Sequence, residues 1–405
     1  MEKIKALIIF VCLFILFYFE PEEVGPITFS QLWKIPLFFY LFWHVIVLGL
    51  GPKPAFVKWA YVRAVKTLFN KGFFIDFMAE VTDFMRYMMF PLMYGFAARK
   101  IKNIVVLDKI LLGFAQFVIL SGIPFLLGLL ESKGKVLFEM ERDLFQSYTG
   151  IFQNPHSASI TTATAVIIIL AMVKSKSAQI KFPKLNLLLA CFGIYIIYLT
   201  YVRTGYLMFA VGLFIVFKPQ KFTLQQIVLS VIVSLVLIFG FVYLLETNEF
   251  FYNRIFDIRN GRQTAVGSGR LDIWEAAIDL WMNGNFLELL LGHGFEELTK
   301  GVQRGTGMKV YAHNEFFTQL GQNGLLGFVF TGVYLYALFK HIWKRRENSS
   351  YKLALGIYCL YFSLMLTQGG VWFPLDIFMV LVFLRLDRQP SVAKISPNEI
   401  GTGVM

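Results

Sequence analysis

Long apolar runs follow one another through most of this sequence, and they restrict its fold more than any other feature. Ile4 to Phe19, Ile35 to Leu50, Leu224 to Leu245 and Leu326 to Trp343 are examples. A helix needs about 20 mostly apolar residues to cross a membrane, and it must satisfy its own backbone hydrogen bonds because lipid offers none. With 57% hydrophobic and 16% charged residues, the chain is unlike an ordinary soluble domain. We therefore predict an all-α polytopic membrane protein.

The basic residues indicate how the chain crosses the membrane. They gather in short segments between the apolar runs, as the positive-inside rule predicts for cytoplasmic loops. Topology therefore explains the net charge of +12 without a nucleic-acid partner. Counting crossings from a cytoplasmic N-terminus gives about twelve transmembrane helices. The predicted divisions are a membrane bundle over residues 1–246 and 313–386, one large, partly helical outer loop over 247–312, and a disordered cytoplasmic tail over 387–405.

The way in which residues 54–98 cross the membrane is not decided by these rules. The same rule predicts that the basic residues here are cytoplasmic: Lys53, Lys58, Arg63, Lys66 and Lys71. The segment then holds two short or tilted spans, or an interfacial helix followed by a hairpin. Four charged residues within it recur at helical spacing and share one face: Asp76, Glu80, Asp83 and Arg86. This face should meet protein or water rather than lipid, as a surface helix with mutually paired charges or as the wall of an aqueous cavity.

The outer loop concentrates candidate anion-binding residues. Three arginines flank or enter its glycine-containing segment: Arg254, Arg259 and Arg262. Arg270 follows in the first turn of a predicted helix that carries Trp274 on its apolar face. A helix N-terminus offers free N–H groups to an anion, and a guanidinium group binds phosphate through two hydrogen bonds. Because cations are normally favoured at the other end of a helix, we interpret Arg270 as an anion-binding residue rather than a structural one.

Two further candidates lie at the outer ends of predicted spans. His313 precedes Asn314 and a helical pattern, and with an ordinary pKa of about 6.5 a histidine can take a proton from a hydroxyl at neutral pH. A buried, hydrogen-bonding role is the commoner one for a lone histidine. Arg203 sits in a tight turn at the outer membrane boundary, where contact with lipid phosphate is the alternative to substrate binding.

A turn at Asn154-Pro155 ends an outer loop, and Ser157 can cap the helix that follows. Between them, His156 is a candidate capping or acceptor-contacting group. The outer loops contain no Asp-x-Asp pair and no His-Glu-x-x-His run, so we expect neither a metal site nor a cofactor. The three cysteines lie in apolar runs without ligand spacing, and we expect neither a disulfide nor zinc.

These residues resemble the O-antigen ligase and O-antigen polymerase superfamily of bacterial inner-membrane glycosyltransferases. The resemblance rests on an ordered set of motifs: Gly150 with Asn154-Pro155, Arg203-Thr204-Gly205, Gly269-Arg270 before Trp274, Leu291-Gly292-His293-Gly294, and His313-Asn314 with Gly324-Leu325-Leu326-Gly327. One departure is His156, where the family commonly has asparagine. The resemblance implies a twelve-helix GT-C-type bundle in the bacterial inner membrane, a periplasmic active site in and around the outer loop, and a glycan donor on undecaprenyl pyrophosphate.

Carried over residue by residue, Arg203 and Arg270 would hold the pyrophosphate, and His313 would activate the acceptor hydroxyl, without a metal or nucleotide. The remaining candidates for donor or glycan contacts are Arg254, Arg259, Arg262, Asn314, Trp274, Asn154, His156 and Arg86. The acceptor would be the lipid A core in a ligase, or a nascent lipid-linked glycan in a polymerase. A function of another class, a transporter or flippase for lipid-linked oligosaccharide, would use the charged face around Arg86 as part of its route.

Overall fold

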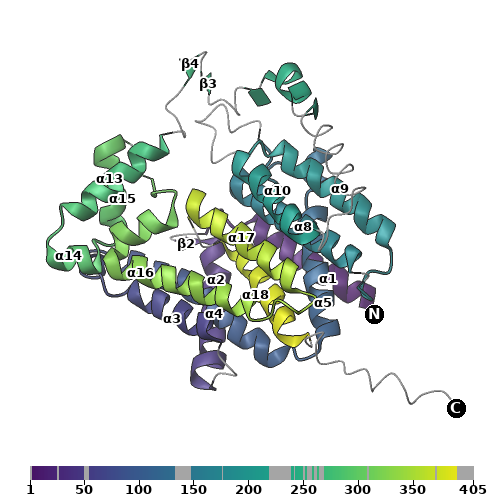
Figure 1. Ribbon diagram of the computed structural model, residues 1–405, viewed down its shortest axis with the longest axis horizontal. Helices are drawn as coiled ribbons and strands as arrows, with labels where there is room; N and C mark the ends of the chain where they lie inside the picture. The colour runs from purple at the N-terminus through teal and green to yellow at the C-terminus, as the bar shows by residue number, and fades with distance from the viewer. Residues whose placement is uncertain are drawn as a thin grey trace.

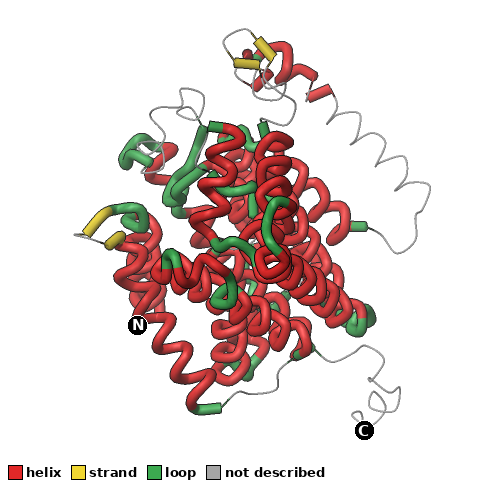
Figure 2. The backbone as a smooth tube through the Cα atoms, turned by 90° about the vertical axis from the view of Figure 1, so that its left-hand side faces the viewer, coloured by secondary structure: helices red, strands yellow, loops and turns green. Residues whose placement is uncertain are grey.

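Most residues that the computed structural model describes are helical, and the strands in Figure 2 are few and short. The described residues are 2–24, 27–49, 54–132, 147–175, 177–218, 239–240, 242–249, 251–252, 258–259, 262–263, 269–307, 310–369 and 372–389. Two antiparallel pairs of two-residue strands occur, β1 (Glu23–Val24) with β2 (Ile27–Thr28) and β3 (Ile258–Arg259) with β4 (Arg262–Gln263). The predicted all-α class is confirmed. The count of twelve spans and the GT-C layout stay predictions.

The helices before the outer loop form most of the bundle. They are α1 (Glu2–Tyr18), α2 (Phe29–Phe42), the π-helical η1 (Trp43–Val47), α3 (Ala55–Lys66), the 3₁₀ turn η2 (Lys71–Phe74), α4 (Phe77–Lys100), α5 (Ile104–Leu120), α6 (Ile123–Leu126), α8 (Pro155–Lys174), α9 (Pro183–Leu199) and α10 (Arg203–Phe217). The later helices are α13 (Arg270–Met282), α14 (Phe286–Leu291), α15 (Phe295–Thr306), α16 (Glu315–Trp343), α17 (Tyr351–Thr367) and α18 (Phe373–Arg388).

Among the described residues, three helical segments are long and apolar enough to cross a membrane: Ile104–Leu126, Pro155–Lys174 and Glu315–Trp343. Shorter apolar helices accompany them in α1, α9, α10 and α17. The core lies where α8 packs against α5, α9 and α10, and the side chains of Ile167, Ile168 and Ile169 on α8 are fully buried there. Because these β-branched residues keep one χ1 rotamer in a helix, they provide a stiff centre for the bundle.

Helices α3 and α4 pack against each other and extend between the two ends of the bundle. The end of α3 contacts the outer loop, because the Lys66 Nζ donates to the carbonyl of Leu291 (2.9 Å). The far end of α4 contacts the end of α18, because the Arg388 guanidinium donates to the carbonyl of Ala98 (2.8 Å). Residues 54–98 therefore form two helices, α3 and α4, that extend between the two ends of the bundle, and whether each spans the membrane stays a prediction.

The same contacts correct the side predicted for part of this segment. Lys71 forms an ion pair with Glu288 of α14 (2.6 Å), and Arg63 forms a buried ion pair with Glu315 at the start of α16. Arg63, Lys66 and Lys71 thus lie at the outer-loop end rather than in a cytoplasmic loop. The positive-inside rule describes solvated loop charges, whereas these cations have carboxylate or carbonyl partners within the protein.

The outer loop docks where α16 is interrupted. At Gly324 the backbone of α16 has φ 66° and ψ −167°, and just before this kink the carbonyls of Gly321 and Gln322 accept hydrogen bonds from His293 (3.0 Å) and Gly294 (2.9 Å). A Cβ atom at Gly292 would lie 2.2 Å from the Gln322 carbonyl oxygen. The Gly-His-Gly motif therefore fits the backbone of the loop against α16, and Figure 1 shows α13, α14 and α15 gathered beside that end of α16.

Candidate active site

Arg270 begins α13, as the sequence predicted. The N-cap is Gly269, whose backbone is left-handed (φ 74°) and which provides no side-chain capping bond. The first backbone N–H groups of a helix have no partner within the helix, and the macrodipole adds positive potential there. The half-buried Arg270 guanidinium is therefore placed at a helix end whose field favours an anion.

A small apolar core joins the start of α13 to the turn before α16. It contains the buried residues Ile273, Ala277, Leu298, Val302 and Ala312. Trp274 strengthens this junction, because its Nε1–H donates to the carbonyl of Ala312 (2.8 Å) and its ring lies 5.3 Å from the ring of Phe317. Trp274 is one helical turn from Arg270, and Ala312 is next to His313. The sequence predicted Trp274 as a substrate contact, and the structure gives it this positioning contact.

His313 lies in a constrained turn beside Arg270. Its backbone is in the left-handed region (φ 48°), which is uncommon for a residue with a side chain. Burial lowers the pKa of His313 below its ordinary value of 6.5, and the positive charge of Arg270 lowers it further. Both effects keep the imidazole neutral at neutral pH, with a lone pair available to accept a proton.

Asn314 fixes this turn to the bundle. Its Oδ1 accepts hydrogen bonds from the backbone N–H groups of Phe316 (2.9 Å) and Phe317 (3.3 Å), so it is the N-cap of α16. Its Nδ2 donates to the carbonyl of Leu366 near the end of α17 (3.0 Å). These contacts explain an asparagine at this position by structure, and its predicted contact with the substrate stays a prediction.

The Asn154-Pro155 turn lies at the same end of the bundle. Asn154 is the N-cap of α8 and accepts a hydrogen bond from the backbone N–H of Ser157 (2.8 Å). The prediction that Ser157 is the cap was wrong, because Pro155 occupies the first helical position and places Asn154 before it. The Nδ1 of His156 pairs with the Nε2 of Gln368 (3.0 Å), which follows α17.

Arg203 begins α10 at this end, and its side chain is exposed. The helix is held close to α8 at Gly205, where a Cβ atom would lie 1.7 Å from the Oγ of Ser159. One group of candidate residues thus surrounds the starts of α8 and α10, and another surrounds His313. The two groups meet at the end of α17, through Gln368 and Leu366 respectively.

The other loop arginines cannot be placed against this site. Arg254 lies outside the described residues, and so do the side chains of Arg259 and Arg262, whose backbones pair in the β3–β4 hairpin. Their predicted contacts with the donor stay predictions.

A buried polar network around Glu315, at the start of α16, was not predicted from the sequence. The guanidinium of Arg63 pairs with the carboxylate of Glu315 and lies 4.3 Å from the centre of the Tyr87 ring. The hydroxyl of Tyr87 donates to Glu315 Oε1 (2.7 Å), and the Nε2 of Gln319 donates both to that hydroxyl (2.8 Å) and to the same carboxylate (3.0 Å). The only sequence signal was an acidic residue two positions after His313.

The charged face of α4 meets protein rather than lipid, as predicted. Glu80 is fully buried and accepts hydrogen bonds from Asn70 (2.8 Å) and from the backbone of Phe295 (2.6 Å). Asp83 is also buried and accepts from Gln322 (2.8 Å). The hydrogen-bond partners of these two carboxylates therefore lie on other elements of the protein. Arg86 is more exposed and lies 3.9 Å from Asp83.

Comparison with known proteins finds one similarity to a family. Residues 187–332 match the family model described as O-antigen ligase. The matched range includes Arg203, Arg270 and His313, and it excludes the Asn154-Pro155 turn. The match confirms the resemblance to the O-antigen ligase and polymerase superfamily, whose members are glycosyltransferase-like ligases and polymerases. With the apolar helices, it indicates an inner-membrane protein. A search of curated proteins gives no match.

Proposed function

We propose that this protein transfers a glycan from undecaprenyl pyrophosphate to an acceptor hydroxyl at the periplasmic face of the inner membrane. The observation that carries the proposal is that a small buried core holds the start of α13 beside the turn of His313, so that the charge of Arg270 lowers the pKa of His313. An arginine at a helix N-terminus is suited to a pyrophosphate, and a neutral histidine beside it is suited to a hydroxyl proton. The family match supports this chemistry.

The reaction has one proton to remove and one anion to release. The acceptor oxygen forms a bond to the anomeric carbon of the donor sugar, and the bond from that carbon to the pyrophosphate oxygen breaks with its electron pair. The hydroxyl proton passes to the imidazole of His313, which becomes a cation. Negative charge grows on the leaving pyrophosphate, where Arg270 and Arg203 would stabilise it in the transition state.

Guanidinium groups take the place that a divalent cation has in many phosphate-releasing enzymes. The proposal therefore includes independence from added metal, which the lack of Asp-x-Asp and His-Glu-x-x-His patterns in the outer loops also favours. Chelation with EDTA should leave the rate of transfer unchanged. A rate that falls with EDTA and returns with magnesium would contradict this part of the proposal.

The lipid A core is the proposed acceptor, which makes the protein an O-antigen ligase. The family match is compatible with a ligase and with a polymerase that extends a lipid-linked glycan. An analysis of the surface glycans of a deletion strain would distinguish a ligase from a polymerase. Polymer that accumulates on the lipid carrier supports a ligase, whereas single repeat units on the core support a polymerase.

The direct test uses purified full-length protein in detergent with lipid-linked donor and acceptor, and it measures released undecaprenyl pyrophosphate. Arg270→Ala and His313→Ala should each lower release about 100-fold or more. Arg304→Ala is the control, because Arg304 is an exposed arginine on α15 of the same loop. Full activity in Arg270→Ala would contradict the proposed chemistry. No release by the wild type with any acceptor would favour a transporter instead.

A further inference from the structure

A cavity of about 530 Å³ lies between α3 and α16, at the end of the bundle opposite the outer loop. Sites for small ligands commonly have about 300–1,000 Å³. The wall includes Ala55 at the start of α3 and Lys344 just after the end of α16, so the cavity is separate from the region around His313. Its size and place make it a candidate for a second ligand.

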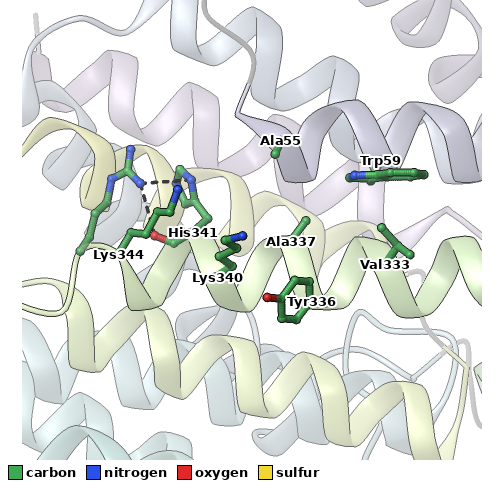
Figure 3. Close-up of a pocket in the computed structure, with 9 residues that line it drawn as sticks. Ala55, Trp59, Val333, Tyr336, Ala337, Lys340, His341 and Lys344 are labelled. Atoms are coloured by element: carbon green, nitrogen blue, oxygen red, sulfur yellow. Dashed lines mark hydrogen bonds between the residues drawn. The ribbon is translucent and has the colours of Figure 1, made fainter.

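The cavity has a cationic end and an apolar end. Figure 3 shows Lys340, His341 and Lys344 gathered toward one end, with Trp59 and Val333 at the other. A phospholipid has the same division between an anionic headgroup and apolar chains. A small soluble anion would use only the cationic end and would leave the apolar wall uncovered.

Two of the cations keep their charge available for a ligand. Asp387 is already bound to Arg345 (2.9 Å) and to His341 (2.8 Å). Lys340 and Lys344 are exposed, and among the residues that the structure describes neither forms an ion pair. The Nζ of Lys340 lies 5.7 Å from the centre of the Tyr336 ring, which belongs to the same wall. An anion bound at this end would therefore neutralise the charges of Lys340 and Lys344.

The place of the cavity along α16 also fits a lipid headgroup. Lys340 lies in the last turn of α16 and Lys344 follows it, at the opposite end of this helix from Glu315. Basic pockets between helices on the cytoplasmic side are suited to anionic headgroups.

We propose that this cavity binds an anionic phospholipid, whose phosphate contacts Lys340 and Lys344 while an acyl chain lies along Trp59 and Val333. Such a lipid would be a resident ligand of the bundle and is independent of the glycan donor. The site goes beyond the proposed transfer reaction, because none of these residues belongs to the group around His313.

The test is native mass spectrometry of the purified full-length protein, titrated with phosphatidylglycerol and with phosphatidylcholine of the same acyl chains. The wild type should bind phosphatidylglycerol more tightly. The double variant Lys340→Gln, Lys344→Gln should weaken that binding about tenfold or more. The control Lys102→Gln, Lys109→Gln removes two exposed lysines near the start of α5 and should leave it unchanged. Equal binding of the two lipids, or equal losses in both variants, would overturn the proposal.

A second variant tests the apolar end and separates a lipid from a simple anion. Trp59→Ala should weaken binding of long-chain phosphatidylglycerol more than binding of a short-chain form, because it removes part of the wall that an acyl chain would cover. Inorganic phosphate at millimolar concentration should not displace the long-chain lipid. Displacement by phosphate alone, or the same loss for both chain lengths, would show an anion site without lipid recognition and would overturn the assignment.

Discussion

The turn that carries His313 is held from two sides by contrasting interactions. On the loop side, a small apolar core around Ala312 packs α13 and α15 together, and Trp274 adds a hydrogen bond to the Ala312 carbonyl. On the bundle side, the contacts are polar and buried, and they centre on the ion pair of Arg63 with Glu315 and the hydroxyl of Tyr87. The first side is built from residues close in sequence, whereas the second joins helices that are far apart in the chain.

Because of this difference, we expect substitutions on the two sides to affect different properties of the protein. An apolar core tolerates small changes of shape when its volume is kept. A buried ion pair does not, because removal of one partner leaves a charge without compensation. We therefore expect changes on the bundle side to lower the stability of the protein first, and changes on the loop side to lower the rate of transfer first.

The largest effect is expected at the buried ion pair. Arg63→Gln or Glu315→Gln should each lower the free energy of unfolding by about 3–5 kcal/mol, because the remaining charge stays buried. Lys58→Gln, which changes an exposed lysine on the same helix, should have little effect. Unfolding in mixed detergent micelles measures the difference. The double variant should recover part of the loss, and single variants as stable as the wild type would refute the contrast between the two sides.

The docking of the loop on α16 should be the next most sensitive feature. Gly292→Ala adds a Cβ atom that would meet the Gln322 carbonyl oxygen, at a residue with φ +88°. Gly307 has a φ of +76° with open space around it, so Gly307→Ala measures the strain of an ordinary left-handed backbone without a steric clash, whereas Gly292 combines the clash with an extended ψ of 170°. We expect losses of about 2–3 kcal/mol and about 1 kcal/mol respectively, from the same unfolding measurement. Equal losses would mean that the loop does not press against α16.

Changes at Trp274 should affect the rate rather than the fold. Trp274→Ala removes both the hydrogen bond to Ala312 and the ring contact with Phe317, and kcat/KM should fall about tenfold because Arg270 and His313 lose their alignment. Trp274→Phe keeps an aromatic ring and should show a loss of about threefold. The melting temperature of Trp274→Phe should stay close to that of the wild type, so that its loss of rate reports the alignment of the site rather than its stability. Transfer at the wild-type rate in Trp274→Ala would show that this contact does not position the site.

The sequence predicted the features that depend on local pattern. Apolar runs predicted the helices, and the pattern after Gly269 placed Arg270 in the first turn of α13. The pairing of Arg63 with Glu315 could not be predicted, because no local spacing indicates that helices so far apart in the chain pack together. The side of Arg63 was wrong for the same reason, since a basic residue in a polar segment resembles a cytoplasmic loop charge until its buried partner is known. Local patterns also do not indicate which of the loop arginines contact the donor.

The pH dependence of transfer tests most directly whether Arg270 and His313 act together. Burial and the charge of Arg270 lower the pKa of His313, so kcat/KM should fall on the acidic side with a midpoint below pH 6.5, as protonation removes the base. In Arg270→Gln, the loss of a nearby positive charge makes protonation easier, and the midpoint of the residual activity should move to higher pH. Arg304→Gln should leave it in place. An acidic midpoint that is the same in the wild type and Arg270→Gln, or that persists in His313→Ala, would contradict the account.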